Sequence, residues 1–112
     1  MPNTAKPARV WFITGATSGF GLALARAVLA RGERAVVTGR RVDRLEAVAA
    51  GHGKRALLIA MDVTAAAARQ AAVAQALAHF GRVDVLANIA GRGSLGAVEE
   101  CGGSGFLDRW IS

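Results

Sequence analysis

The feature that most constrains the fold is a glycine-rich segment, residues 14–21 (TGATSGFG), which stands between two apolar runs. Residues 10–13 before it are β-branched or aromatic, and residues 22–29 after it are mainly Leu and Ala. The first composition favours a strand and the second a helix. Glycines between a strand and a helix let backbone N–H groups approach a phosphate, toward which the helix amino terminus points. The segment therefore predicts a phosphate-binding turn.

A similar alternation of strand-like and helix-like segments continues along the chain. Strands are expected at residues 9–14, 34–38, 56–61 and 83–87, and helices at residues 19–30, 42–50 and 64–80. Strands that alternate with helices at this spacing form right-handed crossover units and a parallel sheet. The expected fold is α/β: a partial doubly wound, Rossmann-like parallel sheet of about four strands in the order 3-2-1-4, with helices on both faces.

The two later helices each carry an apolar stripe at helical spacing, which is expected to pack on the sheet. The stripes consist of Val42, Leu45 and Ala49 in the second helix, and of Val73, Ala76, Leu77 and Phe80 in the third.

The chain divides into three regions by composition. Residues 1–8 contain two prolines and no apolar run, and they are expected to form a disordered arm. Residues 9–100 carry the alternation of strands and helices. Residues 101–112 interrupt it with a glycine-rich run and are interpreted as an atypical tail, of the kind that a truncated or frame-altered coding sequence produces.

The segment after the fourth strand decides how the edge of that strand is covered. Residues 97–100 (AVEE) are expected to begin a helix. The strand at residues 83–87 would then keep unpaired backbone groups along an apolar edge, through which an oligomer could form.

Composition excludes several classes of protein. No apolar run approaches the length of a membrane span, and no apolar signal core precedes the first strand. The single Cys101 cannot form an internal disulfide, which favours a cytoplasmic location. A metal site is not expected, because Cys101, His52 and His79 stand singly and far apart.

The net charge of +6 raises the question of nucleic acid as a partner. The basic residues are dispersed along the chain, and the six aromatic residues do not interleave with them. A stacking platform or a basic stripe is therefore poorly supported, and the pattern argues against nucleic-acid binding.

Residues of the glycine-rich segment have separable roles. Gly15 allows a tight exit from the strand, whereas Gly19 and Gly21 permit close approach of a phosphate and close packing of the helix. The hydroxyls of Thr17 and Ser18 either contact the ligand or cap the helix.

Charged residues end the second and third strands. Arg40 stands where an acidic residue would accept hydrogen bonds from a ribose 2′-hydroxyl, and its guanidinium suits a 2′-phosphate instead. The alternative is a solvated loop charge, which is the favoured interpretation of Arg41. Asp62 is a candidate acceptor for an adenine amino group, with Val63 as an apolar wall. Asp62 and Thr64 are also competing candidates for the N-cap of the next helix.

These motifs together resemble the amino-terminal part of the short-chain dehydrogenase/reductase family. Residues 14–21 match its TGxxxGxG cofactor motif, residues 62–63 its adenine-pocket pair, and residues 85–91 (VLANIAG) its NNAG segment. The resemblance covers about residues 9–100. One departure is Ile89, which replaces the second Asn of NNAG and removes an expected polar contact.

The resemblance implies an NAD(P)-binding oxidoreductase that performs carbonyl–alcohol hydride transfer. Arg40 favours NADP over NAD. The resemblance to this family also implies which residues bind the cofactor: Gly15, Thr17, Ser18, Gly19, Phe20, Gly21, Arg40, Asp62, Val63, Asn88, Ala90 and Gly91.

The catalytic residues of the family have no counterpart in this sequence. The family uses a Ser and a Tyr-x-x-x-Lys motif, in which the Tyr moves a proton to or from the reacting oxygen. This sequence has no Tyr, and Lys6 and Lys54 lie in the wrong regions. The expectation is an NADP-binding chain that is catalytically incomplete. The alternative is a non-catalytic nucleotide-binding or protein-interaction module.

Overall fold

The computed structural model describes residues 9–16, 19–62 and 65–89, and the backbone of residues 97–100. The strands are β1 (Val10–Thr14), β2 (Arg34–Gly39), β3 (Ala56–Ala60), β4 (Val85–Asn88) and β5 (Ala97–Glu100). The helices are α1 (Gly19–Ala30), α2 (Val42–Ala49) and α3 (Ala66–Phe80), with a 3₁₀ turn η1 (Gly53–Arg55) before β3. The bounds lie within about two residues of the expected ones, as is usual for element ends.

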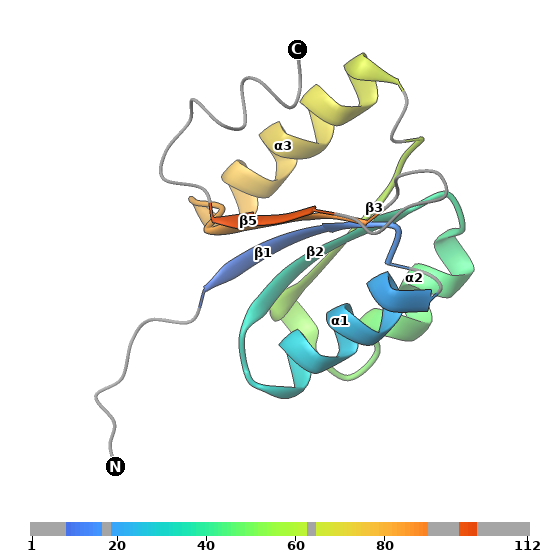
Figure 1. Cartoon of the computed structure of the whole chain (residues 1–112), viewed down its shortest axis with the longest axis vertical. Coiled ribbons are helices and arrows are strands. Elements are labelled where there is room, and N and C mark those ends of the chain that lie inside the picture. The colour runs from blue at the N-terminus through green and yellow to red at the C-terminus, as the bar shows by residue number, and fades with distance from the viewer. Residues whose placement is uncertain (1–8, 17–18, 63–64, 90–96, 101–112) are drawn as a thin grey trace.

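The described strands form one sheet in the order β3-β2-β1-β4-β5. β1 lies between β2 and β4, and these three strands and β3 all run parallel. Helices α1 and α2 cover one face of the sheet and α3 covers the other (Figure 1). The expected α/β fold and the order 3-2-1-4 of its parallel strands are therefore confirmed.

The fifth strand corrects the expectation for residues 97–100. These residues form β5, antiparallel to β4, with Asn88 opposite Ala97 and Val85 opposite Glu100. The local AVEE pattern suits a helix, but pairing with β4 satisfies backbone groups that a helix would leave unpaired along that edge. β5 covers the edge of β4, so the expectation of an open β4 edge is wrong. Oligomer formation itself stays a prediction.

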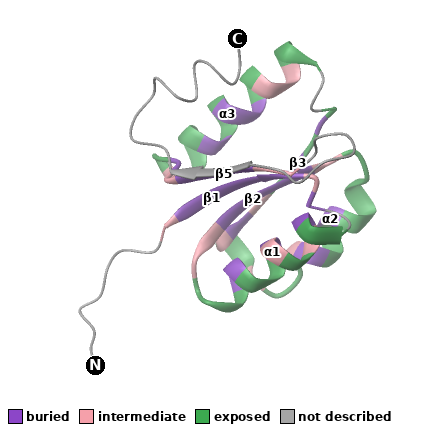
Figure 2. Ribbon diagram, viewed as in Figure 1, coloured by how far each residue is buried: buried purple, intermediate pink, exposed green. Residues whose placement is uncertain are grey.

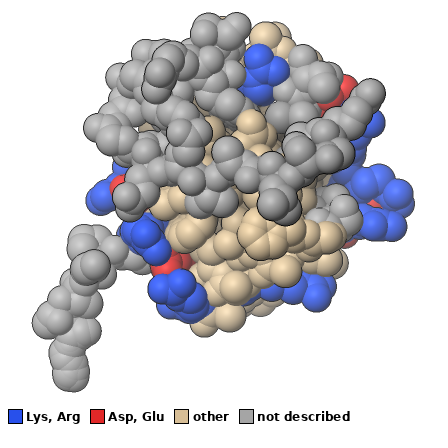
Figure 3. Space-filling view, in the orientation of Figure 1, with Lys and Arg blue, Asp and Glu red and all other residues tan. Residues whose placement is uncertain are grey.

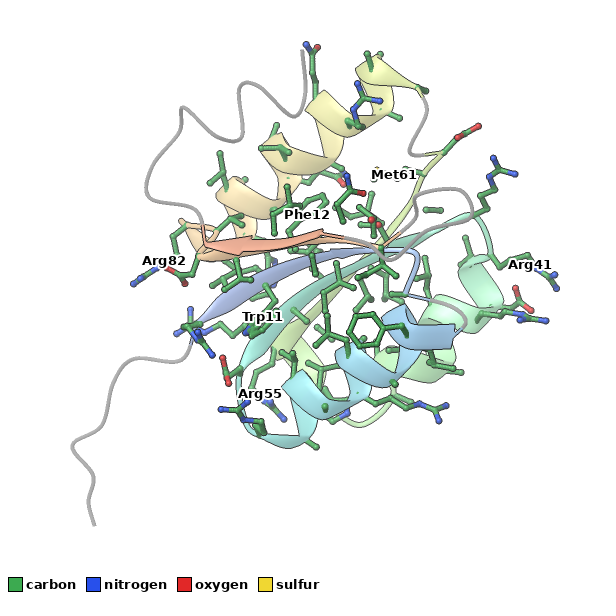
Figure 4. The ribbon with its side chains drawn as sticks, in the orientation of Figure 1. Trp11, Phe12, Arg41, Arg55, Met61 and Arg82 are labelled. Atoms are coloured by element: carbon green, nitrogen blue, oxygen red, sulfur yellow. The ribbon has the colours of Figure 1, made fainter. Side chains whose placement is uncertain are left out.

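Apolar residues of the central strands are buried on both faces of the sheet. All five residues of β1 are buried (Figure 2). Trp11 points toward the α1 and α2 layer and Phe12 points toward α3 (Figure 4). Successive side chains of a strand alternate between faces, so a strand covered on both sides is expected to be mainly apolar. This is the physical reason that residues 10–13 contain no polar side chain.

The buried faces of α2 and α3 differ from the expected stripes. In α2 the buried residues are Leu45 and Val48, while Val42 is 50% exposed. In α3 the buried residues are Ala72, Val73 and Ala76, and Leu77 is 40% exposed. Part of each expected stripe is buried, but Val42 and Leu77 are exposed. The contact with the sheet decides which flanking positions are covered.

A charged cluster lies at the amino ends of β1 and β2, at the sheet edge opposite to the loops discussed below. One Glu33 carboxylate oxygen accepts hydrogen bonds from Trp11 Nε1 at 2.8 Å and from Arg9 Nε at 3.2 Å. Arg31 lies 3.5 Å from the other oxygen. Burial alone would raise the pKa of Glu33, but the hydrogen bond from Trp11 and the charges of Arg9 and Arg31 outweigh it and lower this pKa below its ordinary 4.5.

Glu33→Gln is expected to reduce the free energy of unfolding by about 1 kcal/mol at neutral pH, because the amide keeps the Trp11 contact and loses both ion pairs. A carboxyl whose pKa is lowered by folding stabilises the folded state above its unfolded pKa, and this contribution disappears as the pH falls through the folded value. The difference between the two proteins should therefore shrink below about pH 4.5. Urea unfolding at several pH values measures it, and a difference that grows with acidification would contradict the assignment.

Candidate cofactor-binding site

The loops that follow the parallel strands meet at one edge of the sheet. Thr14 at the end of β1 lies opposite Asn88 at the end of β4, and Gly39 lies opposite Ala60. Backbone hydrogen bonds beyond the strands hold the loops together: Ala16 N–H donates to the Thr38 carbonyl at 3.0 Å. Ligands of open α/β sheets bind along this carboxyl edge, near the strand where the order reverses. Here that strand is β1, which the glycine-rich turn follows.

Backbone geometry accounts for glycine at three positions of the turn. Gly15 has φ +65° and Gly19 has φ +57°, in the left-handed region that residues with a Cβ rarely adopt. A Cβ on Gly21 would lie 2.0 Å from the Gly15 carbonyl oxygen, so only glycine lets α1 begin so close to the end of β1. A Cβ on Gly19 would meet no atom of the described residues within 4 Å, which leaves open space beside the amino end of α1.

Thr14 joins β1 to the loop after β4. Its side chain is fully buried, and its hydroxyl donates to Asn88 Oδ1 at 3.0 Å and accepts from Ile89 N–H at 2.9 Å. Sequence reasoning assigned no role to this hydroxyl. The available signal was a lone Thr at the end of a strand that is otherwise apolar and buried on both faces. Ile89 packs on the apolar cluster beneath α1, so this departure from NNAG is accommodated by apolar packing.

Arg40 and Asp62 contact each other across the ends of β2 and β3. Arg40 Nη2 lies 3.5 Å from Asp62 Oδ1, and their side chains are 73% and 48% exposed. Arg41 Nε instead lies 3.6 Å from Asp43 at the start of α2. Figure 4 shows Arg41 beside α2, directed away from the sheet. Of these two arginines, Arg40 is therefore the one that lies beside the candidate adenine-pocket residue.

The start of α3 bears on the alternative interpretation of Asp62 as the N-cap residue of that helix. The helix begins at Ala66 with Ala65 as its N-cap, and the Ala65 side chain makes no capping hydrogen bond. The Asp62 backbone carbonyl accepts from Ala65 N–H at 3.0 Å, which forms a turn before the helix. The interpretation of Asp62 as the N-cap residue is therefore wrong, because the helix starts later than the sequence pattern indicates. The other candidate, Thr64, lies outside the described residues.

The carboxyl edge thus brings together six of the candidate residues: Gly15, Gly19, Gly21, Arg40, Asp62 and Asn88. Phe20, also a candidate, is 58% exposed in the first turn of α1. Thr17, Ser18, Val63, Ala90 and Gly91 lie outside the described residues. An open glycine turn, a helix amino terminus and an exposed guanidinium fit a ligand with phosphate groups.

Other kinds of site find little support in the described part of the chain. Its His, Cys, Asp and Glu residues form no group of three that could hold a metal ion. None of its helices is long and apolar enough to cross a membrane. On the face in Figure 3, Lys and Arg are spread around the outline and do not gather in one patch. The argument against nucleic-acid binding stays a prediction.

Comparison with known proteins finds relatives that are similar in sequence and in fold. Serine 3-dehydrogenase of Agrobacterium fabrum is 47% identical over 79 residues, which are 70% of this chain and 32% of that protein. A short-chain dehydrogenase from Streptomyces avermitilis has a TM-score of 0.73 at 45% identity, over 77% of this chain and 32% of that one. A 3-ketoacyl-(acyl-carrier-protein) reductase from Brucella melitensis, complexed with NADH, has a TM-score of 0.65 at 41% identity, over 70% of this chain and 32% of that one.

The chain spans about a third of the length of the curated relatives that it matches. A family model described as short chain dehydrogenase matches residues 9–109. The match continues into residues 101–112, which were expected to be a tail outside the family pattern. Together with the sheet order and the glycine-rich turn, this match shows that the chain belongs to the short-chain dehydrogenase/reductase family of oxidoreductases.

Proposed function

We propose that these residues bind NADP(H) for an oxidoreductase that transfers hydride between a carbonyl and an alcohol. The observation that carries the choice of NADP is Arg40, an exposed guanidinium directly after β2. A carboxylate at that point would accept hydrogen bonds from a free ribose 2′-hydroxyl, whereas a guanidinium matches a 2′-phosphate in charge and shape. The Brucella reductase was solved with NADH, so family membership alone does not decide the cofactor.

Each described part of the edge has a distinct task in this proposal. The turn from Gly15 to Gly21 and the amino end of α1 hold the pyrophosphate. Arg40 holds the 2′-phosphate and Asp62 accepts a hydrogen bond from the adenine amino group. Asn88, fixed by the Thr14 hydroxyl, lies beside the cofactor at the end of β4. The bound nicotinamide supplies the hydride chemistry.

Catalysis stands apart from binding in this proposal. The sequence has no Tyr to move a proton at the reacting oxygen. We therefore expect these 112 residues to bind cofactor and not to turn over a carbonyl substrate. The alternative of a protein-interaction module has lost its main support, because β5 covers the edge of β4.

Arg40→Asp is expected to reverse the cofactor preference. The unaltered chain should bind NADPH more tightly than NADH, and the variant should bind NADH more tightly, with the ratio of dissociation constants changing by about tenfold or more. The reason is that the substitution replaces attraction to the 2′-phosphate by repulsion and restores an acceptor for the 2′-hydroxyl. Calorimetric titration of both proteins with both cofactors measures the ratio.

Arg41→Asp provides the matched control, because it makes the same change in net charge at a side chain that pairs with Asp43. It should leave the ratio nearly unchanged. Failure of the unaltered chain to bind either cofactor, or to gain stability from millimolar cofactor, would contradict the proposed function. An equal response of the two arginine variants would remove the specific role of Arg40.

A further inference from the structure

The contact between Arg40 and Asp62 joins two groups that the proposed function assigns to different parts of the cofactor. Arg40 follows β2 and Asp62 follows β3, at the end where Gly39 is paired with Ala60. Met61 N–H donates to the Gly39 carbonyl at 2.8 Å, so the parallel ladder continues beyond the last paired residues. The backbone therefore holds the two side chains near each other, with 3.5 Å between Arg40 Nη2 and Asp62 Oδ1.

This contact has different consequences for a nucleotide with a 2′-phosphate and for one with a free 2′-hydroxyl. A 2′-phosphate that binds Arg40 must share or displace the Asp62 carboxylate, and it also meets the negative charge of that carboxylate. A ribose with a free 2′-hydroxyl brings no charge to this point and leaves the ion pair in place. Both side chains are largely exposed, so the pair is of the weak kind that salt screens.

We propose that Asp62 is a specificity-determining residue that weakens the preference for 2′-phosphorylated nucleotides by competing for the Arg40 guanidinium. This inference rests on the proposed function, since it requires that Arg40 binds the 2′-phosphate. Any contact of Asp62 with the adenine ring is common to both nucleotides and cancels in their ratio. The preference therefore reports the competition for Arg40 separately from adenine binding.

The test compares adenosine 2′,5′-bisphosphate with adenosine 5′-monophosphate, which differ only in the 2′-phosphate. Asp62→Asn keeps an oxygen acceptor for adenine and removes the charge. The preference for the bisphosphate, measured as the ratio of dissociation constants by calorimetry, should rise by about two- to fivefold in this variant. The rise should shrink at high salt.

Two controls separate the pair from general electrostatics. Asp43→Asn removes one negative charge from the nearby Arg41 pair, and it should change the ratio far less than Asp62→Asn. In an Arg40→Gln background, Asp62→Asn should raise the ratio much less than it does in the unaltered chain, because only the direct repulsion between the Asp62 carboxylate and the 2′-phosphate is then removed.

An unchanged or reduced ratio in Asp62→Asn would overturn the inference, as would an equal rise in Asp43→Asn or a rise of undiminished size in the Arg40→Gln background. If the Arg40→Gln variant shows the same ratio of dissociation constants as the unaltered chain, the proposed role of Arg40 fails, and the inference fails with it. A ratio that depends on Arg40 and not on Asp62 overturns the inference alone and leaves the proposed function standing.

Discussion

Gly21→Ala is expected to lower the free energy of unfolding by about 2 kcal/mol and to abolish nucleotide binding. The added Cβ would lie 2.0 Å from the oxygen and 2.8 Å from the carbon of the Gly15 carbonyl, and neither backbone atom can move without displacing the turn. Helix propensity acts in the opposite direction, since Ala is favoured over Gly inside a helix by about 1 kcal/mol. The steric term is expected to win, because relief requires α1 to shift away from β1.

The control for this prediction is Gly32→Ala, at the turn after α1. Gly32 has φ +84°, but a Cβ there would meet nothing within 4 Å, so its cost is backbone strain of about 1–2 kcal/mol without any clash. Gly32 is remote from the carboxyl edge, and nucleotide binding should survive in folded Gly32→Ala. Urea unfolding gives the stabilities and titration with NADPH gives the binding. A stable Gly21→Ala variant that binds as tightly as the unaltered chain would contradict the packing argument.

The parts of the fold that the sequence predicted correctly are those in which local pattern and long-range packing agree. Residues 10–13 are apolar without interruption because β1 is covered on both faces, and this pattern is visible without knowledge of its neighbours. Gly15, Gly19 and Gly21 mark places where backbone geometry excludes a side chain. Requirements of this kind can be recognised directly in the amino-acid sequence.

The parts that could not be predicted depend on contacts between distant segments. The AVEE segment at residues 97–100 favours a helix by its local composition, and only its pairing with the edge of β4 makes it a strand. Leu77 fits the apolar stripe of α3 but lies beyond the area that the sheet covers. The contact between Arg40 and Asp62 depends on the register of β2 with β3, which no local pattern reveals.

The second large effect is expected at Thr14, whose hydroxyl hydrogen-bonds Asn88 at the end of β4 and Ile89 directly after it. Thr14→Val should lower the free energy of unfolding by about 2–3 kcal/mol, because it removes the acceptor for Ile89 N–H and the donor to Asn88 in a buried setting. The Asn88 side chain and the Ile89 backbone would lose their anchor to β1. Nucleotide affinity should therefore fall even at temperatures at which the variant remains folded.

Thr38→Val is the matched control for this second prediction, since Thr38 is an equally buried threonine whose hydroxyl makes one hydrogen bond, to the Ile13 carbonyl at 3.0 Å. It loses a single donor and should cost about 1 kcal/mol, with nucleotide affinity retained. Thermal unfolding with and without NADPH distinguishes the two variants, because only Thr14→Val should lose the stabilisation that the cofactor provides. If the two variants lost stability and cofactor protection equally, the hydrogen bonds of the Thr14 hydroxyl would be ordinary buried ones, with no special part in nucleotide binding.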